Sequence, residues 1–204
     1  MSAVKSRSQK SQGKIRIAGR NARNEMGDHE RDVAAEKITE KVVHSPWFQR
    51  AGYIACYLPT PQEVDTWMII ARAWSMKKRI FAPVIEKNRQ MLFQEITPDT
   101  RIRISKFGLY EPDGGEIATA RMLDVVLTPV VAFDSSNRRV GMGGGYFDTT
   151  FSFLKHRIIH FHPKLIGLAF ACQKVKEIAP NPWDVPLFAV ITEREQASLH
   201  AENL

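Results

Sequence analysis

The 204-residue chain has only two cysteines, no long hydrophobic run and no acidic residue among its first 24 positions. Cys56 and Cys172 fit neither a disulfide framework nor a zinc motif, because no Cys-x-x-Cys or Cys/His spacing occurs. Both lie in apolar sequence, so we expect two buried, reduced thiols in a cytoplasmic protein. No apolar run approaches the roughly 20 residues that span a bilayer, and none follows the N-terminus as a secretory signal would. We therefore expect neither a membrane protein nor a secreted one.

The positive charge of the chain is concentrated near its N-terminus. The formal net charge is +7, from 29 basic and 22 acidic residues. Seven basic residues precede the first acid, Glu25, and without them the basic and acidic residues are equal in number. Such a segment is typical of a nucleic-acid or acidic-membrane contact, a polyphosphate site, an organellar transit peptide or a solvated, disordered tail. We assign residues 1–11 to a flexible basic tail and residues 12–204 to one domain, long enough to bury a sizeable core.

Alternating helical and strand patterns predict an α/β domain. Apolar residues recur every three or four positions in 28–43, and Thr60, Pro61 and Glu63 provide the N-cap, N1 and N3 residues of a helix over 60–76. Short apolar, β-branched segments predict strands at 51–58, 79–84, 92–96, 124–133, 165–170 and 189–192. Residues 97–120 are predicted to be irregular, with a turn at 111–115. The order predicts a single three-layer α/β/α domain with a mostly parallel central sheet.

The most informative segment is RVGMGGGYFD, residues 139–148. It places four glycines within five residues, an arginine two residues before the first and a carboxylate three residues after the last. Glycine can adopt positive φ, which lets successive N–H groups converge on an anionic oxygen. The apolar residues that follow recur at helical spacing, at Phe147, Phe151, Leu154, Ile158 and Phe161. Nucleotide sites commonly form at such a turn between a strand and a helix.

The spacing of this segment matches neither common nucleotide fingerprint. No Lys-Ser/Thr pair follows the glycines, and the pattern is GxGGG rather than GxGxxG. A glycine-rich hairpin or lid is the alternative explanation, but the flanking Arg139 and Asp148 favour a phosphate site.

Six pieces of the sequence, taken in order and at their separations, are more specific than any one of them. They are Ile15-Arg16, the segment Tyr57 to Thr66, Glu111-Pro112, the segment Pro129 to Asp134, the glycine segment, and Pro182 to Leu187. Together they resemble the 5-formyltetrahydrofolate cyclo-ligase family, over about residues 12–193.

The resemblance implies an ATP-dependent ring closure that uses Mg²⁺ and acts on 5-formyltetrahydrofolate, with or without a polyglutamate tail. The γ-phosphate would activate the formyl oxygen, and N10 would then close the ring with loss of phosphate. It further implies a monomer with no nucleic-acid or membrane partner. The competing hypotheses are a nucleic-acid or ribosome-associated module and a sugar-phosphate or acyl-CoA enzyme of similar layout.

The resemblance also assigns roles to individual residues. For ATP these are Lys14, Arg16, Arg139, Gly141, Met142, Gly143, Gly144, Gly145 and Tyr146. Leu58, Glu63 and Tyr146 would contact the folate, Asp148 and Asp184 would bind magnesium, and Arg139 and Tyr146 would be catalytic. The chain departs from the family pattern at Gln12, Phe147, Thr149 and Phe188. Because Gln12 replaces a basic residue, the charge there is left to Lys10 or Lys14.

Local sequence leaves a structural alternative open for several of these residues. Arg16 could be one of several solvated tail charges. Glu63 could serve only as the capping partner of Thr60, and Leu58 could be an ordinary core residue. Asp148 could cap the next helix, and Asp184 could be a turn residue. The histidines at 156, 160 and 162 lack a carboxylate or cysteine partner at metal-binding spacing, so we interpret them as a solvated helix end.

Overall fold

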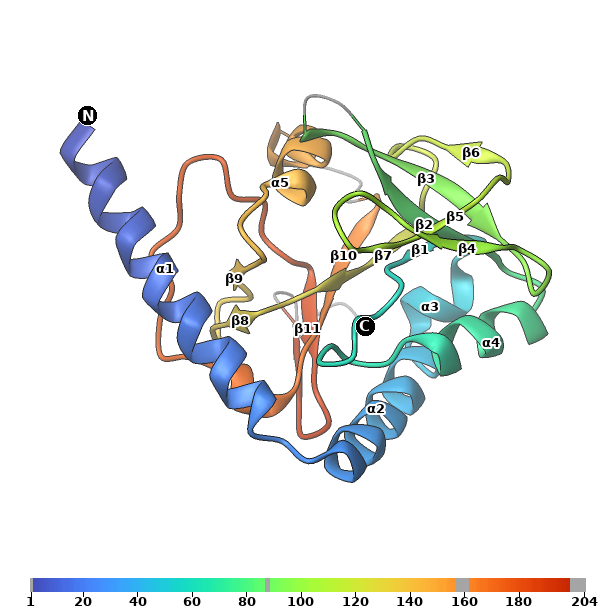
Figure 1. Cartoon of the computed structure of the whole chain (residues 1–204), viewed down its shortest axis with the longest axis horizontal. Coiled ribbons are helices and arrows are strands. Elements are labelled where there is room, and N and C mark those ends of the chain that lie inside the picture. Colours follow the sequence, from blue (N-terminus) through green and yellow to red (C-terminus); the bar gives the residue numbers. More distant parts are fainter. Residues whose placement is uncertain (1, 87–88, 157–161, 199–204) are drawn as a thin grey trace.

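The computed structural model describes residues 2–86, 89–156 and 162–198 (Figure 1). The helices are α1 Ser2–Asn24, α2 Asp28–Val43, α3 Pro46–Arg50, α4 Trp67–Ser75 and α5 Tyr146–Thr150, with 3₁₀ turns at Ser152–His156 and Ala171–Gln173. The first seven strands along the chain are β1 Tyr53–Cys56, β2 Arg79–Ile85, β3 Met91–Ile96, β4 Ile102–Ile104, β5 Tyr110–Pro112, β6 Ile117–Ala118 and β7 Val125–Pro129. The later strands are β8 Ala132–Phe133, β9 Arg139–Val140, β10 Lys164–Leu168, β11 Ala189–Ile191 and β12 Gln196–Ser198.

The central sheet has eight strands in the order β12-β11-β10-β7-β1-β2-β3-β6. Strands β11, β10, β7, β1 and β2 run parallel, whereas β12, on one side, and β3 and β6, on the other, pair antiparallel with their neighbours. In the register of the centre, Ile54 of β1 lies beside Val125 of β7 and Ile80 of β2. The predicted mostly parallel sheet is confirmed.

Both faces of the sheet are covered, because successive side chains of a strand point to opposite sides. Ile54 of β1 belongs to a core that includes the buried Ile38, Phe48 and Ile69 of α2, α3 and α4. Ala55, the next residue of β1, belongs to a second core with the buried Phe151, which follows α5. The three-layer α/β/α arrangement is therefore confirmed.

Helix α1 lies along one side of the molecule, next to β8, β9 and the turn at Ala171–Gln173 (Figure 1). The contact is close at Gly19, where an added Cβ would lie 2.3 Å from the backbone oxygen of Val131. The helix includes residues predicted as a tail as well as the start of the predicted domain, so the boundary at residue 12 stays a prediction. Within the described part of the chain, no helix is both long and apolar enough to cross a membrane.

The helix predicted over 60–76 is shorter than expected and starts at Trp67. Hydrogen bonds to the end of β1 hold the preceding residues in a loop. The Tyr57 hydroxyl donates to the carbonyl of Val64 at 3.0 Å, and the buried Thr66 hydroxyl donates to the carbonyl of Tyr57 at 2.8 Å. Thr60 and Glu63 form only a single turn, in which the Glu63 N–H donates to the Thr60 carbonyl. The capping pattern of Thr60 and Glu63 therefore correctly predicted a turn, but the prediction that a helix starts there was wrong.

Three other segment predictions need correction. The strand predicted over 124–133 is divided, because the Gln173 side chain donates to the carbonyls of Val130 and Val131, and β8 then pairs with β9. The segment 97–120 contains the short strands β4, β5 and β6. The helix after the glycines changes to a 3₁₀ turn at Ser152, while the predicted positions Ile158 and Phe161 lie outside the described residues.

The two cysteines differ in exposure, which corrects the expectation of two buried thiols. Both are free, but Cys172 is exposed while Cys56 is buried. Burial raises the pKa of the Cys56 thiol to about 12.

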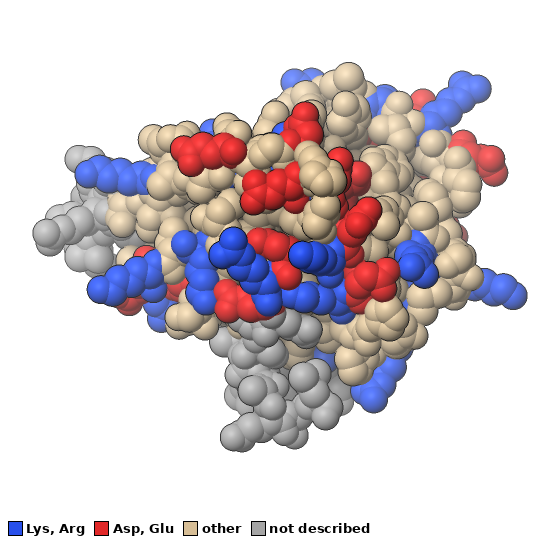
Figure 2. All heavy atoms as spheres, turned by 90° about the horizontal axis from the view of Figure 1, so that it is seen from below, with Lys and Arg blue, Asp and Glu red and all other residues tan. Residues whose placement is uncertain are grey.

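Surface charge is mixed on the face seen from below in Figure 2. There the lysine and arginine side chains of the described residues lie among aspartates and glutamates. On this face they do not form one uniform basic patch of the kind that binds a nucleic-acid backbone.

Candidate active site

A cavity of about 250 Å³ opens at the carboxyl ends of the central strands. Tyr57 and Leu58 follow β1, Pro83 and Ile85 lie at the end of β2, and Pro129 ends β7; all five line the cavity. The chain leaves β1 toward β2 on one side, and β7 flanks β1 on the other. The cavity thus lies where the strand order reverses, the usual ligand position in a parallel α/β sheet.

The glycine loop forms a second wall of the cavity, and three of its four glycines are required by geometry. Gly143 and Gly145 have φ angles of 106° and 71°, which other residues rarely adopt. Gly144 is needed for another reason, since a Cβ there would lie 2.5 Å from the ring of Tyr146. The loop therefore folds back under the Tyr146 ring and begins α5.

Arg16 reaches the glycine loop from α1. Its Nε donates to the carbonyl of Gly141 at 2.7 Å, and its guanidinium lies 3.5 Å from the position that a Gly143 Cβ would take. Burial lowers the pKa of Arg16, and the positive charge of Arg20 lowers it further. Arg16 thus belongs to the cavity wall and is not a solvated tail charge.

The two other N-terminal positions singled out by sequence behave differently. Lys14 is exposed and does not line the cavity, whereas Gln12 does. The Gln12 amide donates to the Asp184 carboxylate at 3.3 Å and to the carbonyl of Ala179 at 3.2 Å. The residue that replaces a cation therefore ties α1 to the loop that carries Asp184.

Arg139, Asp148 and Val185 form a closed ring of hydrogen bonds. Arg139 donates through Nη2 to Asp148 Oδ1 at 2.9 Å and through Nη1 to the Val185 carbonyl at 2.6 Å. The Val185 N–H donates to the same Asp148 oxygen at 3.0 Å. The Arg139 side chain is only 5% exposed, so burial lowers its pKa while Asp148 and Asp184 oppose that shift. The ring holds a buried cation at the end of the glycine loop.

Asp148 and Asp184 are the two carboxylates at this end of the cavity. Asp184 accepts the N–H of Asn181 at 2.8 Å, so the turn role considered from sequence is present. Among the described residues, no group of three or more His, Cys, Asp and Glu side chains is arranged around a metal position. A carboxylate pair still suits Mg²⁺, which takes one or two protein carboxylates and completes its shell with water and substrate phosphates.

Glu63 lies across the cavity from this pair. Its Oε2 accepts the N–H and the hydroxyl of Thr60, both at 3.0 Å, so the capping contact expected from sequence is made. Oε1 has no hydrogen bond to a described residue and can accept one from a ligand. Tyr57 is fully buried below it, and burial raises the pKa of Tyr57 well above its ordinary value, with Glu63 as the next cause.

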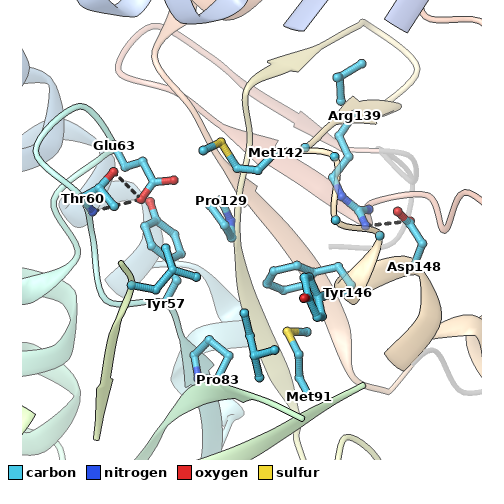
Figure 3. A pocket seen from close by; sticks show the side chains of 18 of the residues that line it. Tyr57, Thr60, Glu63, Pro83, Met91, Pro129, Arg139, Met142, Tyr146 and Asp148 are labelled. Atoms are coloured by element: carbon cyan, nitrogen blue, oxygen red, sulfur yellow. Dashed lines mark hydrogen bonds and ion pairs between the residues drawn. The ribbon is translucent and has the colours of Figure 1, made fainter. Parts of the chain in front are cut away.

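Figure 3 shows how these groups face one another across the cavity. Glu63 and Thr60 lie on one side, and Arg139 and Asp148 lie on the other, with Met142 and Tyr146 between them. The cavity floor is formed by apolar side chains, among them Pro83, Met91 and Pro129. An aromatic ring with polar edges and a chain of anionic groups would therefore meet complementary surfaces.

Of the predicted site residues, all except Lys14 line this one cavity. Sequence reasoning missed several other lining residues, namely Gln12, Pro83, Ile85, Met91, Leu109, Tyr110, Glu111, Pro129 and Trp183. Glu111, Pro129 and Trp183 belong to the quoted pieces, and Gln12, on α1, was noted only as a departure from the family pattern. No local pattern marks the others, which come from strand ends and a hairpin.

Comparison with known proteins decides the family. The model of the 5-formyltetrahydrofolate cyclo-ligase family matches residues 8–193. The chain belongs to this family. A 5-formyltetrahydrofolate cyclo-ligase of Haemophilus influenzae is 31% identical over 181 residues, which cover 87% of this chain and 95% of that protein. The cyclo-ligase of Escherichia coli K12 is 30% identical and covers 81% of this chain and 90% of that protein.

The fold is likewise that of the cyclo-ligase family. The structure of Aquifex aeolicus 5,10-methenyltetrahydrofolate synthetase superposes with a TM-score of 0.79. It has 23% sequence identity and covers 95% of each chain. The resemblance drawn from the six sequence pieces is thus confirmed.

Proposed function

We propose that this chain converts 5-formyltetrahydrofolate to 5,10-methenyltetrahydrofolate with consumption of ATP. The formyl oxygen would attack the γ-phosphorus and release ADP. N10 would then attack the formyl carbon, lose its proton and expel phosphate with the former formyl oxygen. The observation that carries the proposal is a single cavity with phosphate-type donors on one wall and a free carboxylate oxygen on the other.

The triphosphate would lie along the glycine loop. Backbone N–H groups from Gly141 to Tyr146 and the guanidinium of Arg16 would hold its oxygens. Arg139 would stabilise the charge that develops on the transferred phosphoryl group, since its burial strengthens electrostatic interactions. No protein nucleophile is needed, because the substrate supplies both attacking atoms and the site supplies position and charge.

The reduced pterin would lie over the apolar floor, between Tyr146 and the end of β1. Glu63 has one oxygen occupied by Thr60, so its direction is set before substrate binds. The other oxygen would accept hydrogen bonds from the N–H groups at the pterin edge, and Leu58 would pack against the ring. Tyr146 lies between Glu63 and Arg139 in Figure 3, so it would contact both ligands.

Mg²⁺ would bind at the end of the cavity that holds Asp148 and Asp184. The two side chains would bind it together with phosphate oxygens, and the ion would neutralise charge on the triphosphate when bound. Asp148 would do so through Oδ2, because Oδ1 already accepts two hydrogen bonds.

The test is turnover of the purified protein with 5-formyltetrahydrofolate, ATP and Mg²⁺, followed by the long-wavelength absorbance of the methenyl product. We expect product only when all three are present and expect EDTA to stop it. Folded protein that forms no chromophore under any buffer condition refutes the assignment. Product that forms equally well in EDTA refutes only the metal sites.

We further propose that the protein works as a cytoplasmic monomer without a nucleic-acid or membrane partner. Free thiols at Cys56 and Cys172 suit a reducing compartment. Light scattering of the active protein tests the monomer, and a larger species with activity confined to it would contradict the proposal.

A further inference from the structure

Helix α1 carries a row of arginines, two of which contact the glycine loop. Arg16, Arg20 and Arg23 are spaced by four and three residues, which places them on one face of the helix. Arg16 donates to the carbonyl of Gly141, as described above. One turn further, Nη2 of Arg20 lies 3.7 Å from the Sδ atom of Met142. The helix therefore contacts two successive residues of the loop through two successive arginines.

The charge of Arg20 has little to balance it. Its Nε is buried and has no hydrogen-bond partner among the described residues. None of their carboxylates lies within ion-pair distance of Arg20, and a thioether is only a weak acceptor. Arg23, next along the row, also has a buried, unpartnered Nε, but its charge is partly balanced: burial lowers its pKa and the Glu63 carboxylate opposes that shift. Since a cation whose buried nitrogen lacks a partner is costly, Arg20 has the character of a ligand for an anion.

Arg20 contacts a side chain that lines the cavity, that of Met142. Met142 lines the cavity, but Arg20 does not. The Met142 side chain is about half exposed, and methionine has three rotatable bonds and packs adaptably. A rotation of this side chain would expose the Arg20 guanidinium to whatever lies on the glycine loop.

We infer that Arg20 is a further ligand of the nucleotide phosphates, resting against the Met142 sulfur until a triphosphate replaces it. This inference depends on the proposed function, because it places ATP on the glycine loop. An anion between Arg16 and Arg20 would also relieve their mutual repulsion, which is seen in the lowered pKa of Arg16 after the larger effect of burial. Arg20 contacts the glycine loop, where the triphosphate is proposed to lie. Its ligand is therefore a phosphate rather than a carboxylate of the folate tail.

The experiment compares ATP, ADP and folate binding by calorimetry for the wild type and Arg20→Gln. Lys37→Gln is the control. Lys37 is exposed on α2, so this substitution also removes one positive charge, but from a helix other than the one that contacts the glycine loop. We expect Arg20→Gln to weaken ATP binding about tenfold or more, the effect of one charge-assisted hydrogen bond, and to leave folate affinity unchanged. Lys37→Gln should change neither affinity.

Each result has a distinct meaning. A wild type that binds no ATP refutes the proposed function. A wild type that binds ATP while a folded Arg20→Gln binds it equally well overturns the inference. Loss of folate affinity with ATP affinity unchanged also overturns it, in favour of a folate carboxylate. If Arg20→Gln does not fold, Arg20→Lys keeps the charge but not the planar fork. It should bind ATP several-fold more weakly, and an unchanged affinity again overturns the inference.

Discussion

Replacing Gly19 by alanine should damage the protein, although the same change usually stabilises a helix. An alanine Cβ at this position would lie 2.3 Å from the Val131 carbonyl oxygen, and real Cβ contacts essentially never fall below 3.0 Å. Helix α1 and the start of β8 must then separate by at least about 0.7 Å. Overpacking of this kind costs about 1–3 kcal/mol, against a gain of up to about 1 kcal/mol from helix propensity. We expect a net loss of about 1 kcal/mol in the free energy of unfolding.

The same displacement should impair the nucleotide site. Arg16 lies one turn from Gly19, and its 2.7 Å hydrogen bond to Gly141 would stretch beyond useful length. The KM for ATP should therefore rise about tenfold, which is the effect of one charged hydrogen bond. The KM for folate should change little, because Glu63 and Leu58 lie outside α1.

Gly13→Ala is the matched control, since an added Cβ at Gly13 meets nothing within 4 Å on the same helix. It should stabilise the protein by up to about 1 kcal/mol. Urea unfolding gives both stabilities, and steady-state kinetics gives both KM values. The reasoning fails if the two variants are equally stable, or if Gly19→Ala keeps the wild-type KM for ATP.

Three further predictions concern single side chains. Asp148→Asn breaks the ion pair with the buried Arg139 and should lower kcat at least a hundredfold, with an unchanged circular dichroism spectrum; a normal rate would remove Asp148 from the site. Glu63→Gln should raise the KM for folate about tenfold and spare that for ATP, and an equal rise in both would contradict a pterin contact. Iodoacetamide at pH 9 should modify the exposed Cys172 but not Cys56, whose pKa of about 12 keeps it a thiol until the fold opens; mass spectrometry of the native protein distinguishes the two sites.

The raised pKa of Cys56 also has a consequence for stability. The folded-state pKa of about 12 exceeds the ordinary value of 9.0, so the unfolded chain releases this proton first as pH rises. The contribution of Cys56 is complete below pH 9 and falls by about 1.4 kcal/mol per pH unit between 9 and 12.

Sequence patterns predicted those features whose causes are local. The apolar spacing of 28–43 gives α2 with the same ends, because one buried stripe and a solvated face define a helix. The glycine run could also be interpreted from sequence, because the constraints on it come from residues within the same loop. Gly143 and Gly145 need positive φ, and Gly144 is constrained by Tyr146, two residues later.

Features that depend on distant partners were not accessible in this way. Arg16 meets Gly141 across 125 residues, and Gln12 meets Asp184 across 172 residues. No local pattern distinguishes Arg16 from a solvated tail charge, so only the family resemblance assigned it to the site. The start of α4 was missed for a similar reason, since hydrogen bonds from Tyr57 and Thr66 hold the loop that local capping rules assigned to the helix.

The hydrogen-bond ring around Asp148 leaves one carboxylate oxygen for the proposed cation. Arg139 and Val185 both donate to Oδ1, so only the other oxygen remains available. Calcium often takes both oxygens of a carboxylate, whereas magnesium takes one within a tight octahedron. A calcium ion bound through both would have to break two bonds beside a buried arginine, and magnesium would leave them intact. The ring would thus disfavour an ion that needs both oxygens of Asp148, whereas an ion bound through Oδ2 alone would leave it intact.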